Sequence, residues 1–565
     1  MVAGTDFVAY DGPAVGSTKF FSKANSKPVF YAAIAVFGAI LYGYDGTYFT
    51  SILAMDQFLR DYGTLQPNGT YLVDSSRQGI LASAVQIGEF FGSLTASFIG
   101  DRYGRKGGFL GACAYVTVGV IIQIIPKGSV AALGTGRAIL GMGVGVVSNA
   151  TPLYLSEVAP TAIRGVVVSS WQLMLAIGQV IGACVGQGTK DITNSAAYRI
   201  PIGLNLVIVL IICLGMLILP ESPRWLLTKG REEQAMASLR KINSSQEDPE
   251  LVASTEFKAF AQARQDELAA QGDGGWASMV KDSVERRKFI CVLGVLICQQ
   301  IGGVQFIFSY TTNFFLAIGI DDAFLVTIIV DVIEVFGVLC SFLVIPRFGR
   351  RPLLIYTSIP MVISLFVCGI LGCIDNRNTN ENRCIAAMIC IYVFFFNVAW
   401  GPLAWTMASE LATGQNRQKL MSLGTACFWV IAWAVTFTLP YLFNDEPGSA
   451  GLGPKIGFIY GPGALIALLF VYFYLPETKG RSLEEINEML VSRVPTRKWQ
   501  SYTTSIEKTH AARVDAAAGV GGAGQARPTS ASDVDEEADM KTEGEVKKGG
   551  ELSGAKETMN ATHDA

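Results

Sequence analysis

The sequence predicts an all-α membrane protein in which twelve transmembrane helices form two pseudo-symmetric bundles of six, with a helical linker on the cytoplasmic side. Two observations predict this class. Of the 565 residues, 50% are hydrophobic and 16% are charged, whereas ordinary globular chains carry about 25% charged residues. The charged residues also gather in a few loops and a tail, which leaves apolar stretches of about 20 residues, the length that a bilayer-spanning helix needs.

The apolar stretches fall into two groups of six. The first group is 29–53, 79–99, 109–125, 130–154, 166–187 and 202–219, and the second is 289–317, 324–345, 353–374, 385–407, 420–443 and 456–475. Glu, Lys and Arg are frequent between the groups, as in REEQAMASLRKI, and predict soluble helices. The expected domains are a cytoplasmic N-terminal segment (1–28), a first bundle (29–219), a linker (220–288), a second bundle (289–475), a short cytoplasmic helix (476–490) and a disordered cytoplasmic tail (491–565).

Lysine and arginine placement predicts the orientation of the spans. Clusters lie at 102–106, 286–288 and 347–351. Because cytoplasmic loops carry the excess of Lys and Arg, we expect these loops and both termini in the cytoplasm, in a protein of the plasma membrane. No apolar signal core precedes the first span, so no cleaved signal peptide is expected. The loop after the first span is then outside, and Asn68 in its NGT sequence is a candidate glycosylation site.

The residues that usually carry chemistry argue against an enzyme. His510 and His563 are the only histidines and lie in the polar tail, so histidine catalysis and imidazole metal sites are not expected in the folded part. We predict no cofactor, no metal and no nucleic-acid partner, and the GxxxxGK[ST] loop of ATP-driven pumps is missing from the sequence. The 11 cysteines show no CxxC spacing and are interpreted as small buried hydrophobic residues. Cys373 and Cys384, which flank a short polar loop, are the one pair considered for a disulfide.

Three motifs occur once in each half, in the same order. DRYGRK at 101–106 matches PRFGRR at 346–351, SEVAPTAIRG at 156–165 matches SELATGQNR at 409–417, and PESPR at 220–224 matches PETKGR at 476–481. Such duplicated motifs indicate a repeated unit. Further motifs, in order, are GYDG at 43–46, GRAILGMGVG from Gly136, QQIGGVQ from Gln299 and WGPLAW from Trp400.

With these motifs, over about 29–486, the chain resembles the sugar porters of the major facilitator superfamily, and fungal hexose transporters most of all. The resemblance implies the major facilitator fold in a lipid bilayer, with a substrate site between the halves near mid-membrane. It also implies alternating access and a small-molecule sugar as substrate, a hexose with glucose first.

The resemblance further implies which residues meet the sugar. A sugar offers hydroxyls and C–H faces, so its pocket needs amide donors and acceptors together with aromatic rings. The matching residues are Gln172, Gln299, Gln300, Gln305, Tyr310, Glu334, Asn397, Trp405 and Trp429. Gln305, Asn397, Phe428 and Glu334 depart from the family's usual residues, and Glu334 stands where Asn is typical, which leaves a hexose, a pentose and a larger sugar open. An intramembrane glutamine can also simply bond to a neighbouring helix.

Charged residues inside the spans suggest proton coupling. Asp45 and Arg137 are expected at matching depth, roughly 10 to 12 Å below the outer surface at about 1.5 Å per residue, and intramembrane charges are costly unless paired. By resemblance to the family's proton symporters, protonation of Asp45 would release Arg137 and link proton entry to sugar binding. Glu334, with Asp331 one turn away, is the alternative titrating group. The predicted function is sugar–proton symport, with facilitative uniport and sugar sensing as alternatives.

The duplicated cytoplasmic motifs predict salt bridges that form when the inner side is closed. Their residues are Arg102, Arg105, Glu157, Arg164, Arg347, Arg350, Glu410 and Arg417. Exposed pairs contribute only about 0 to 1 kcal/mol each, but several together can bias two states; the alternative is that these charges only set topology. In the tail, Lys541, Lys547 and Lys548 are candidate ubiquitin sites, and the tail itself is a candidate signalling contact.

Overall fold

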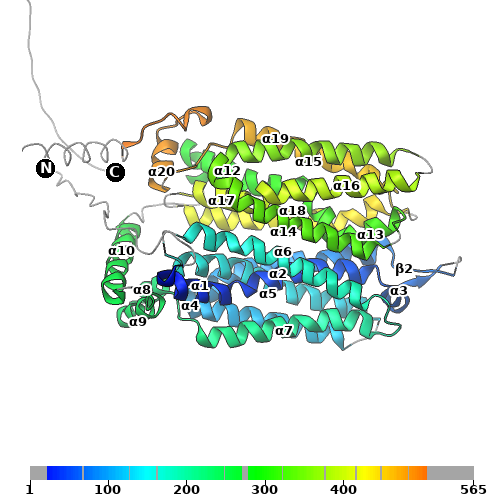
Figure 1. Cartoon of the computed structure of the whole chain (residues 1–565), viewed down its shortest axis with the longest axis horizontal. Helices are drawn as coiled ribbons and strands as arrows, with labels where there is room; N and C mark the ends of the chain where they lie inside the picture. Colours follow the sequence, from blue (N-terminus) through cyan, green and yellow to red (C-terminus); the bar gives the residue numbers. More distant parts are fainter. Residues whose placement is uncertain are drawn as a thin grey trace, which may run out of the picture. The chain divides into compact units, whose positions relative to one another are not determined.

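The computed structural model confirms an all-α membrane fold (Figure 1). It describes residues 22–505 except 67–68, 126–127, 161–162, 247, 270–277, 321, 375–376, 414–415, 446–447 and 482. The candidate glycosylation site Asn68 and the tail lysines lie outside the described residues. In the described part, 11 helices are long and apolar enough to cross a membrane. The remaining predicted span is the first part of α4, where Gln78, Gln86 and Glu89 are buried and lower the hydropathy.

The N half, residues 26–218, is built from seven helices and one hairpin. The elements are α1 (Ser26–Ala35), α2 (Phe37–Leu53), α3 (Asp56–Tyr62), β1 (Thr64–Leu65), β2 (Tyr71–Leu72), α4 (Ser75–Ile124), α5 (Val130–Val158), α6 (Arg164–Thr189) and α7 (Ala196–Ile218). The antiparallel strands pair Thr64 with Leu72 and Leu65 with Tyr71, a small hairpin that the hydropathy pattern does not predict. Helix α4 contains two spans, because Gly104 breaks it with φ 87° and ψ −179°.

The linker and the C half, residues 283–473, follow. The linker holds α8 (Pro223–Thr228), α9 (Glu232–Ile242), α10 (Pro249–Ala269) and α11 (Ser278–Lys281). The C half holds α12 (Ser283–Ile301), α13 (Val304–Ala317), α14 (Ala323–Phe348), α15 (Arg351–Gly372), α16 (Thr379–Phe395), the π-turn η2 (Phe396–Trp400), α17 (Gly401–Leu411), α18 (Arg417–Phe443), the short 3₁₀ turn η3 (Gly453–Ile456) and α19 (Gly457–Phe473). After it come α20 (Leu483–Val491) and the turn η4 (Thr496–Lys498).

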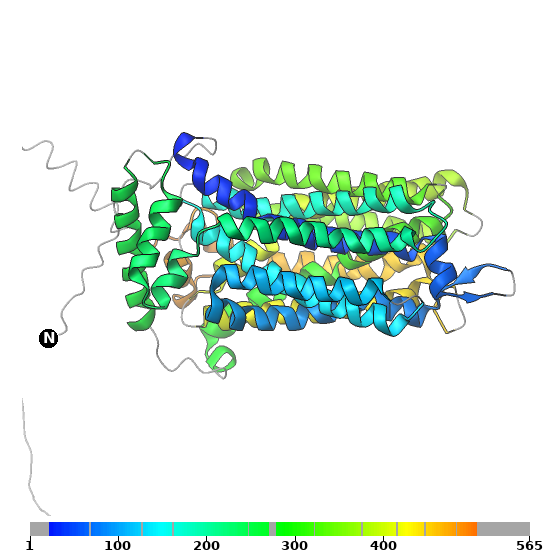
Figure 2. The same cartoon turned by 90° about the horizontal axis from the view of Figure 1, so that it is seen from below.

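The two ends of the helix bundle differ. Helices α8, α9, α10 and α20 lie at one end, called here the linker end, and α3 with the β1–β2 hairpin lies at the other, called the hairpin end (Figures 1 and 2). Two breaks at mid-height shape the C half. Gly303 begins α13 in the left-handed region (φ 87°), which glycine adopts at no steric cost, and η2 widens the helix before Gly401, as π-turns often do at functional sites.

Two expectations need correction. All 11 cysteines are free, so the disulfide between Cys373 and Cys384 is wrong. The two thiols have different surroundings, since Cys373 is exposed at the end of α15 while Cys384 is half-buried on α16.

The predicted start of the disordered tail at residue 491 is also wrong. The Trp499 ring is buried and its Nε1 donates to the Val494 carbonyl at 3.1 Å. The Arg287 guanidinium donates to the same carbonyl at 2.9 Å. These contacts hold the chain to the linker end as far as Ser505, where the described part stops.

Candidate functional site

Side-chain amides from both halves meet at mid-height. Gln172 on α6 donates from Nε2 to Asn397 Oδ1 at 3.5 Å, across the interface between the halves. Gly401 lies beside this pair, since an added Cβ there would stand 3.3 Å from Gln172 Nε2. Behind it, Gln299 donates from Nε2 to the carbonyl of Trp400 at 2.9 Å. The helix break around η2 therefore brings three of the predicted residues, Gln172, Gln299 and Asn397, into one neutral polar cluster.

A row of aromatic rings runs through both halves. Tyr42 stacks on Trp171 with centroids 6.1 Å apart and meets the edge of Trp429 at 6.0 Å. Phe428 joins Trp429 to Trp405, with centroid distances of 4.9 and 5.0 Å. The predicted rings Trp405 and Trp429 thus belong to a continuous row. The Nε1 of Trp429 is buried without a hydrogen-bond partner, which leaves a donor available in this row.

The other predicted sugar contacts lie apart from the cluster or point differently. Gln300 is buried and its Oε1 has no hydrogen-bond partner. Gln305 accepts from the Ser309 hydroxyl one turn along α13 at 3.4 Å. Tyr310 donates to Gln78 Oε1 of the N half at 3.4 Å, toward the hairpin end. Tyr310 therefore joins the halves and is not a member of the amide cluster.

A carboxyl group occupies the same interface closer to the hairpin end. Glu334 on α14 is fully buried. With the Gln179 amide oriented so that its nitrogen faces Glu334, that nitrogen lies 2.9 and 2.7 Å from the two carboxyl oxygens. Gln179 is seven residues after Gln172 on α6, or about 10 Å along the helix. Asp331, one turn before Glu334, is buried, and its Oδ2 has no hydrogen-bond partner.

The predicted pair of Asp45 and Arg137 is in contact inside the N half. Arg137 Nη1 lies 3.8 Å from Asp45 Oδ1, and both side chains are buried. Arg137 also donates to the Leu81 carbonyl at 3.0 Å and to the Tyr48 hydroxyl at 3.4 Å. Its guanidinium lies 3.6 Å from the centroid of the Phe49 ring, a cation–π contact. These contacts hold Arg137 in place independently of Asp45, so the carboxyl group can change its charge without losing its neighbour.

The halves are joined at the hairpin end. Lys190 Nζ lies 3.1 Å from Asp322 Oδ1. Asn444 donates to Ser75 at 3.0 Å and to Gln78 at 3.1 Å. Because each bond connects one half to the other, the hairpin end is closed. Partial desolvation raises the pKa of Asp322, but the hydrogen bond from Lys190 acts in the opposite direction, and the net pKa is lowered.

At the linker end, the duplicated motifs form ion pairs within each half. Arg105 Nη2 lies 2.8 Å from Glu157 Oε1 in the N half, and Arg350 Nη2 lies 3.0 Å from Glu410 Oε1 in the C half. Both ion pairs are present while the hairpin end is closed. Their formation therefore does not depend on opening of the hairpin end.

The remaining gate residues are not placed in such pairs by the structure. Arg102, Arg347 and Arg417 are exposed at the linker end. Arg164 begins α6, but its side chain lies outside the described part.

A second glutamate in each half, absent from the predicted gate residues, accepts backbone bonds at the same end. Glu221 accepts from the N–H groups of Arg105 at 2.9 Å and Lys106 at 3.3 Å. Glu477 accepts likewise from Arg350 at 3.0 Å and Arg351 at 2.9 Å. Burial raises the pKa of Glu221, against the lowering effect of these N–H groups. The PESPR and PETKGR motifs thus place a carboxylate cap on the helix that follows each glycine break.

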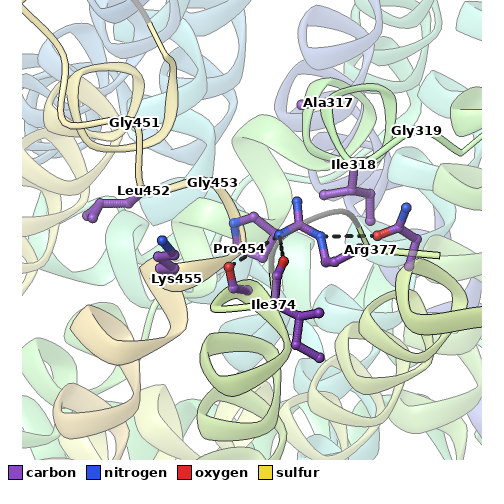
Figure 3. Close-up of a pocket in the computed structure, with 12 residues that line it drawn as sticks. Ala317, Ile318, Gly319, Ile374, Arg377, Gly451, Leu452, Gly453, Pro454 and Lys455 are labelled. Carbon is purple, nitrogen blue, oxygen red and sulfur yellow. Dashed lines mark hydrogen bonds between the residues drawn. The ribbon is translucent and has the colours of Figure 1, made fainter.

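One depression lies away from the amide cluster. It has a volume of about 470 Å³ at the hairpin end of the C half, between the ends of α13 and α15 and the turn η3. Figure 3 shows Arg377 in it, with Nη1 donating to the carbonyls of Gly372 at 3.2 Å and Ile374 at 3.4 Å, and Nε donating to Asn382 at 3.3 Å. These bonds turn the guanidinium toward its own loop.

Sequence reasoning missed Gln179, Tyr42, Trp171 and Glu89. Gln179 could have been found, because residues seven apart share one helix face. Glu89 is a buried acid inside a span, and such acids are functional candidates by default. Tyr42 and Trp171 carry no distinguishing signal, since aromatic residues are common throughout these spans.

Two six-helix halves with a polar cluster between them define a membrane transporter of the major facilitator class. The chain belongs to the sugar transporter family, because the family model described as "Sugar (and other) transporter" matches residues 31–490. It is 34% identical to the major facilitator-type transporter ecdD of Aspergillus rugulosus, over 84% of this chain and 89% of that protein. It is 31% identical to the low-affinity glucose transporter HXT3 of Saccharomyces cerevisiae, over 84% of each chain.

Two further comparisons extend this picture. The high glucose sensor RGT2 of Saccharomyces cerevisiae is 33% identical over 83% of this chain, but over only 61% of its own length. The xylose transporter XylE from E. coli has the same fold, with a TM-score of 0.68 at 23% identity over 81% of this chain and 100% of that chain.

Proposed function

We propose that this protein carries a hexose, glucose first, across the plasma membrane together with a proton, by opening its two ends in turn. One observation carries the sugar site: the neutral cluster in which Gln172 of one half contacts Asn397 of the other, with Gln299 behind Gly401. Such amides match sugar hydroxyls as both donors and acceptors, and the row of rings from Tyr42 to Trp405 offers faces to C–H groups. The relative HXT3 is named a low-affinity glucose transporter, which supports glucose as the substrate proposed here.

Alternating access is supported by where the halves are held together. The bonds of Asn444 and Lys190 join the halves at the hairpin end, whereas the carboxylate caps and ion pairs of the linker end lie within single halves. Each half can therefore move as a unit when the hairpin-end bonds break. We assign the linker end to the cytoplasm, since its loops carry the clustered Lys and Arg.

Proton coupling is supported by the pair of Asp45 and Arg137. Ionised Asp45 attracts Arg137 at 3.8 Å, and a proton on Asp45 removes that attraction. Tyr42 lies three residues before Asp45 on α2, so the two share a helix face, and Tyr42 contacts the rings beside the amide cluster. A change at Asp45 is thereby transmitted to the sugar site through one helix turn.

Uptake of labelled glucose by a transporter-deficient cell tests the sugar site. Gln299→Ala should lower uptake at least about tenfold, since a buried amide is lost from the cluster and two backbone carbonyls lose their donor. Gln123→Ala is the matched control, because that buried amide donates to Gly119 of its own helix. Equal uptake by both variants at equal surface abundance would refute the site. Background uptake with persistent sugar-dependent signalling would instead identify a sensor.

Sugar-induced alkalinisation of the medium tests the coupling. Symport predicts alkalinisation that a protonophore and Asp45→Asn both abolish. Equal glucose uptake with and without a pH gradient would identify a uniporter.

A further inference from the structure

The contact between Gln179 and Glu334 can form in two protonation states. An ionised carboxylate accepts from the amide N–H₂, at the 2.7 and 2.9 Å separations seen here. A protonated carboxyl group can donate its O–H to the amide oxygen after the amide turns. The two states differ in charge, while the contact between α6 and α14 is kept.

That charge has no cationic partner in the described part of the chain. None of the ion pairs among the described residues includes Glu334 or Asp331. The Gln179 amide of α6 contacts Glu334, and Asp331 lies one turn earlier on the same helix; Tyr42 of α2 is the further titratable group that interacts electrostatically with Glu334. A buried carboxylate without a cation is strongly disfavoured, and a neighbouring acid disfavours it further.

Closure of the hairpin end is what buries the Glu334 carboxyl group without a cationic partner. Glu334 belongs to the C half and Gln179 to the N half, so the carboxyl group is sealed only when the halves meet. When they part toward the hairpin end, water can solvate the carboxylate. Ionisation of Glu334 therefore favours the open hairpin end, and protonation favours the closed one.

We propose that Glu334 is a second proton-binding site, separate from Asp45, which takes up a proton from the solution at the hairpin end before that end closes. The oxygen–hydrogen bond forms on the Glu334 carboxyl group as a hydronium ion of the solution loses one of its O–H bonds and becomes water. The inference rests on the proposed function only for the movement of the two halves. It requires neither sugar nor a given sugar specificity.

A cysteine reporter at the hairpin-end interface measures the fraction of protein in which this end is open. Ser75 is buried and accepts from Asn444, so the thiol in Ser75→Cys reacts with a water-soluble maleimide only when the halves part. Purified protein carrying this reporter is labelled without sugar between about pH 5 and pH 8, and the labelling of the parent cysteines is subtracted. The open fraction should fall with acidification by up to about tenfold per pH unit, the limit for one proton.

Neutral variants at Glu334 distinguish titration of Glu334 from titration of Asp45. Glu334→Gln should abolish the pH dependence and give slow labelling at every pH, whereas Asp45→Asn should retain it. Glu334→Asn serves as a second neutral variant, since Asn is typical at this position in the family. The proposal is overturned if neutral variants at Glu334 keep the pH dependence, if Asp45→Asn alone removes it, or if the reporter protein shows none. Because no sugar is present, failure of the uptake experiment would not produce any of these results.

Discussion

The ion pair between Lys190 and Asp322 allows the energy of hairpin-end closure to be tested. Asp322 also begins α14 as its N-cap, with Oδ1 accepting from the Leu325 N–H at 3.2 Å. Asp322→Asn removes the charge and keeps a good cap. The side chains of Lys190 and Asp322 are 23% and 41% exposed, so solvent screens the pair and its contribution is about 0.2 to 1 kcal/mol. The open fraction should then rise by about 1.4-fold to about 5-fold.

Labelling of the Ser75→Cys reporter measures this change. Lys190→Met should give the same increase as Asp322→Asn. In about 1 M salt, where the Debye length is about 3 Å, the parent should approach both variants. The lowered pKa of Asp322 means that the pair stabilises the closed end at neutral pH and loses its effect as the pH falls below about 4. An unchanged labelling rate at low salt, or an increase above about tenfold, would refute the view that this is a screened surface pair.

Three further predictions concern the linker end. Glu157→Gln should lower the stability of the protein in detergent by about 1.5 to 3 kcal/mol, as a lower thermal midpoint, because Arg105 loses a charged partner at 2.8 Å; an unchanged midpoint would contradict this. Gly349→Ala should lower the stability of the protein by about 1 to 3 kcal/mol, since the backbone at this position has a φ of 87° and a ψ of −173°, which suit glycine alone. Gly188→Ala, where an added Cβ meets open space, is its control, and equal midpoints would refute the argument. Trp499→Ala should expose the C-terminal segment to protease earlier than in the parent, because the buried ring is its anchor; equal protection would show that the backbone bonds suffice.

The membrane spans could be predicted because their signal is local. Apolar length alone finds the helices, and the matching depth of Asp45 and Arg137 predicts a contact that the structure places at 3.8 Å. The amide cluster was also predictable in part, since Gln299 stands in the QQIGGVQ motif and the family resemblance implies Gln172 and Asn397 as sugar contacts.

What the sequence did not predict depends on the rotation of helices about their axes. Apolar length does not say which face of α6 meets α14, and therefore the contact of Gln179 with Glu334 was missed. Likewise, the sequence does not show that Cys373 is exposed while Cys384 is half-buried, and both are free. The anchor of the segment after α20 is a single buried Trp499 with backbone bonds, which has no periodicity to detect.

The carboxylate caps of Glu221 and Glu477 make the two halves interchangeable building blocks. Each glutamate neutralises the start of a helix in its own repeat, so neither repeat depends on the other to finish its folding at this end. A hybrid that combines one half of this chain with the opposite half of a relative would inherit an intact cap in both pieces. The surfaces facing the central amides and the bonds that join the halves at the hairpin end would then need to be matched.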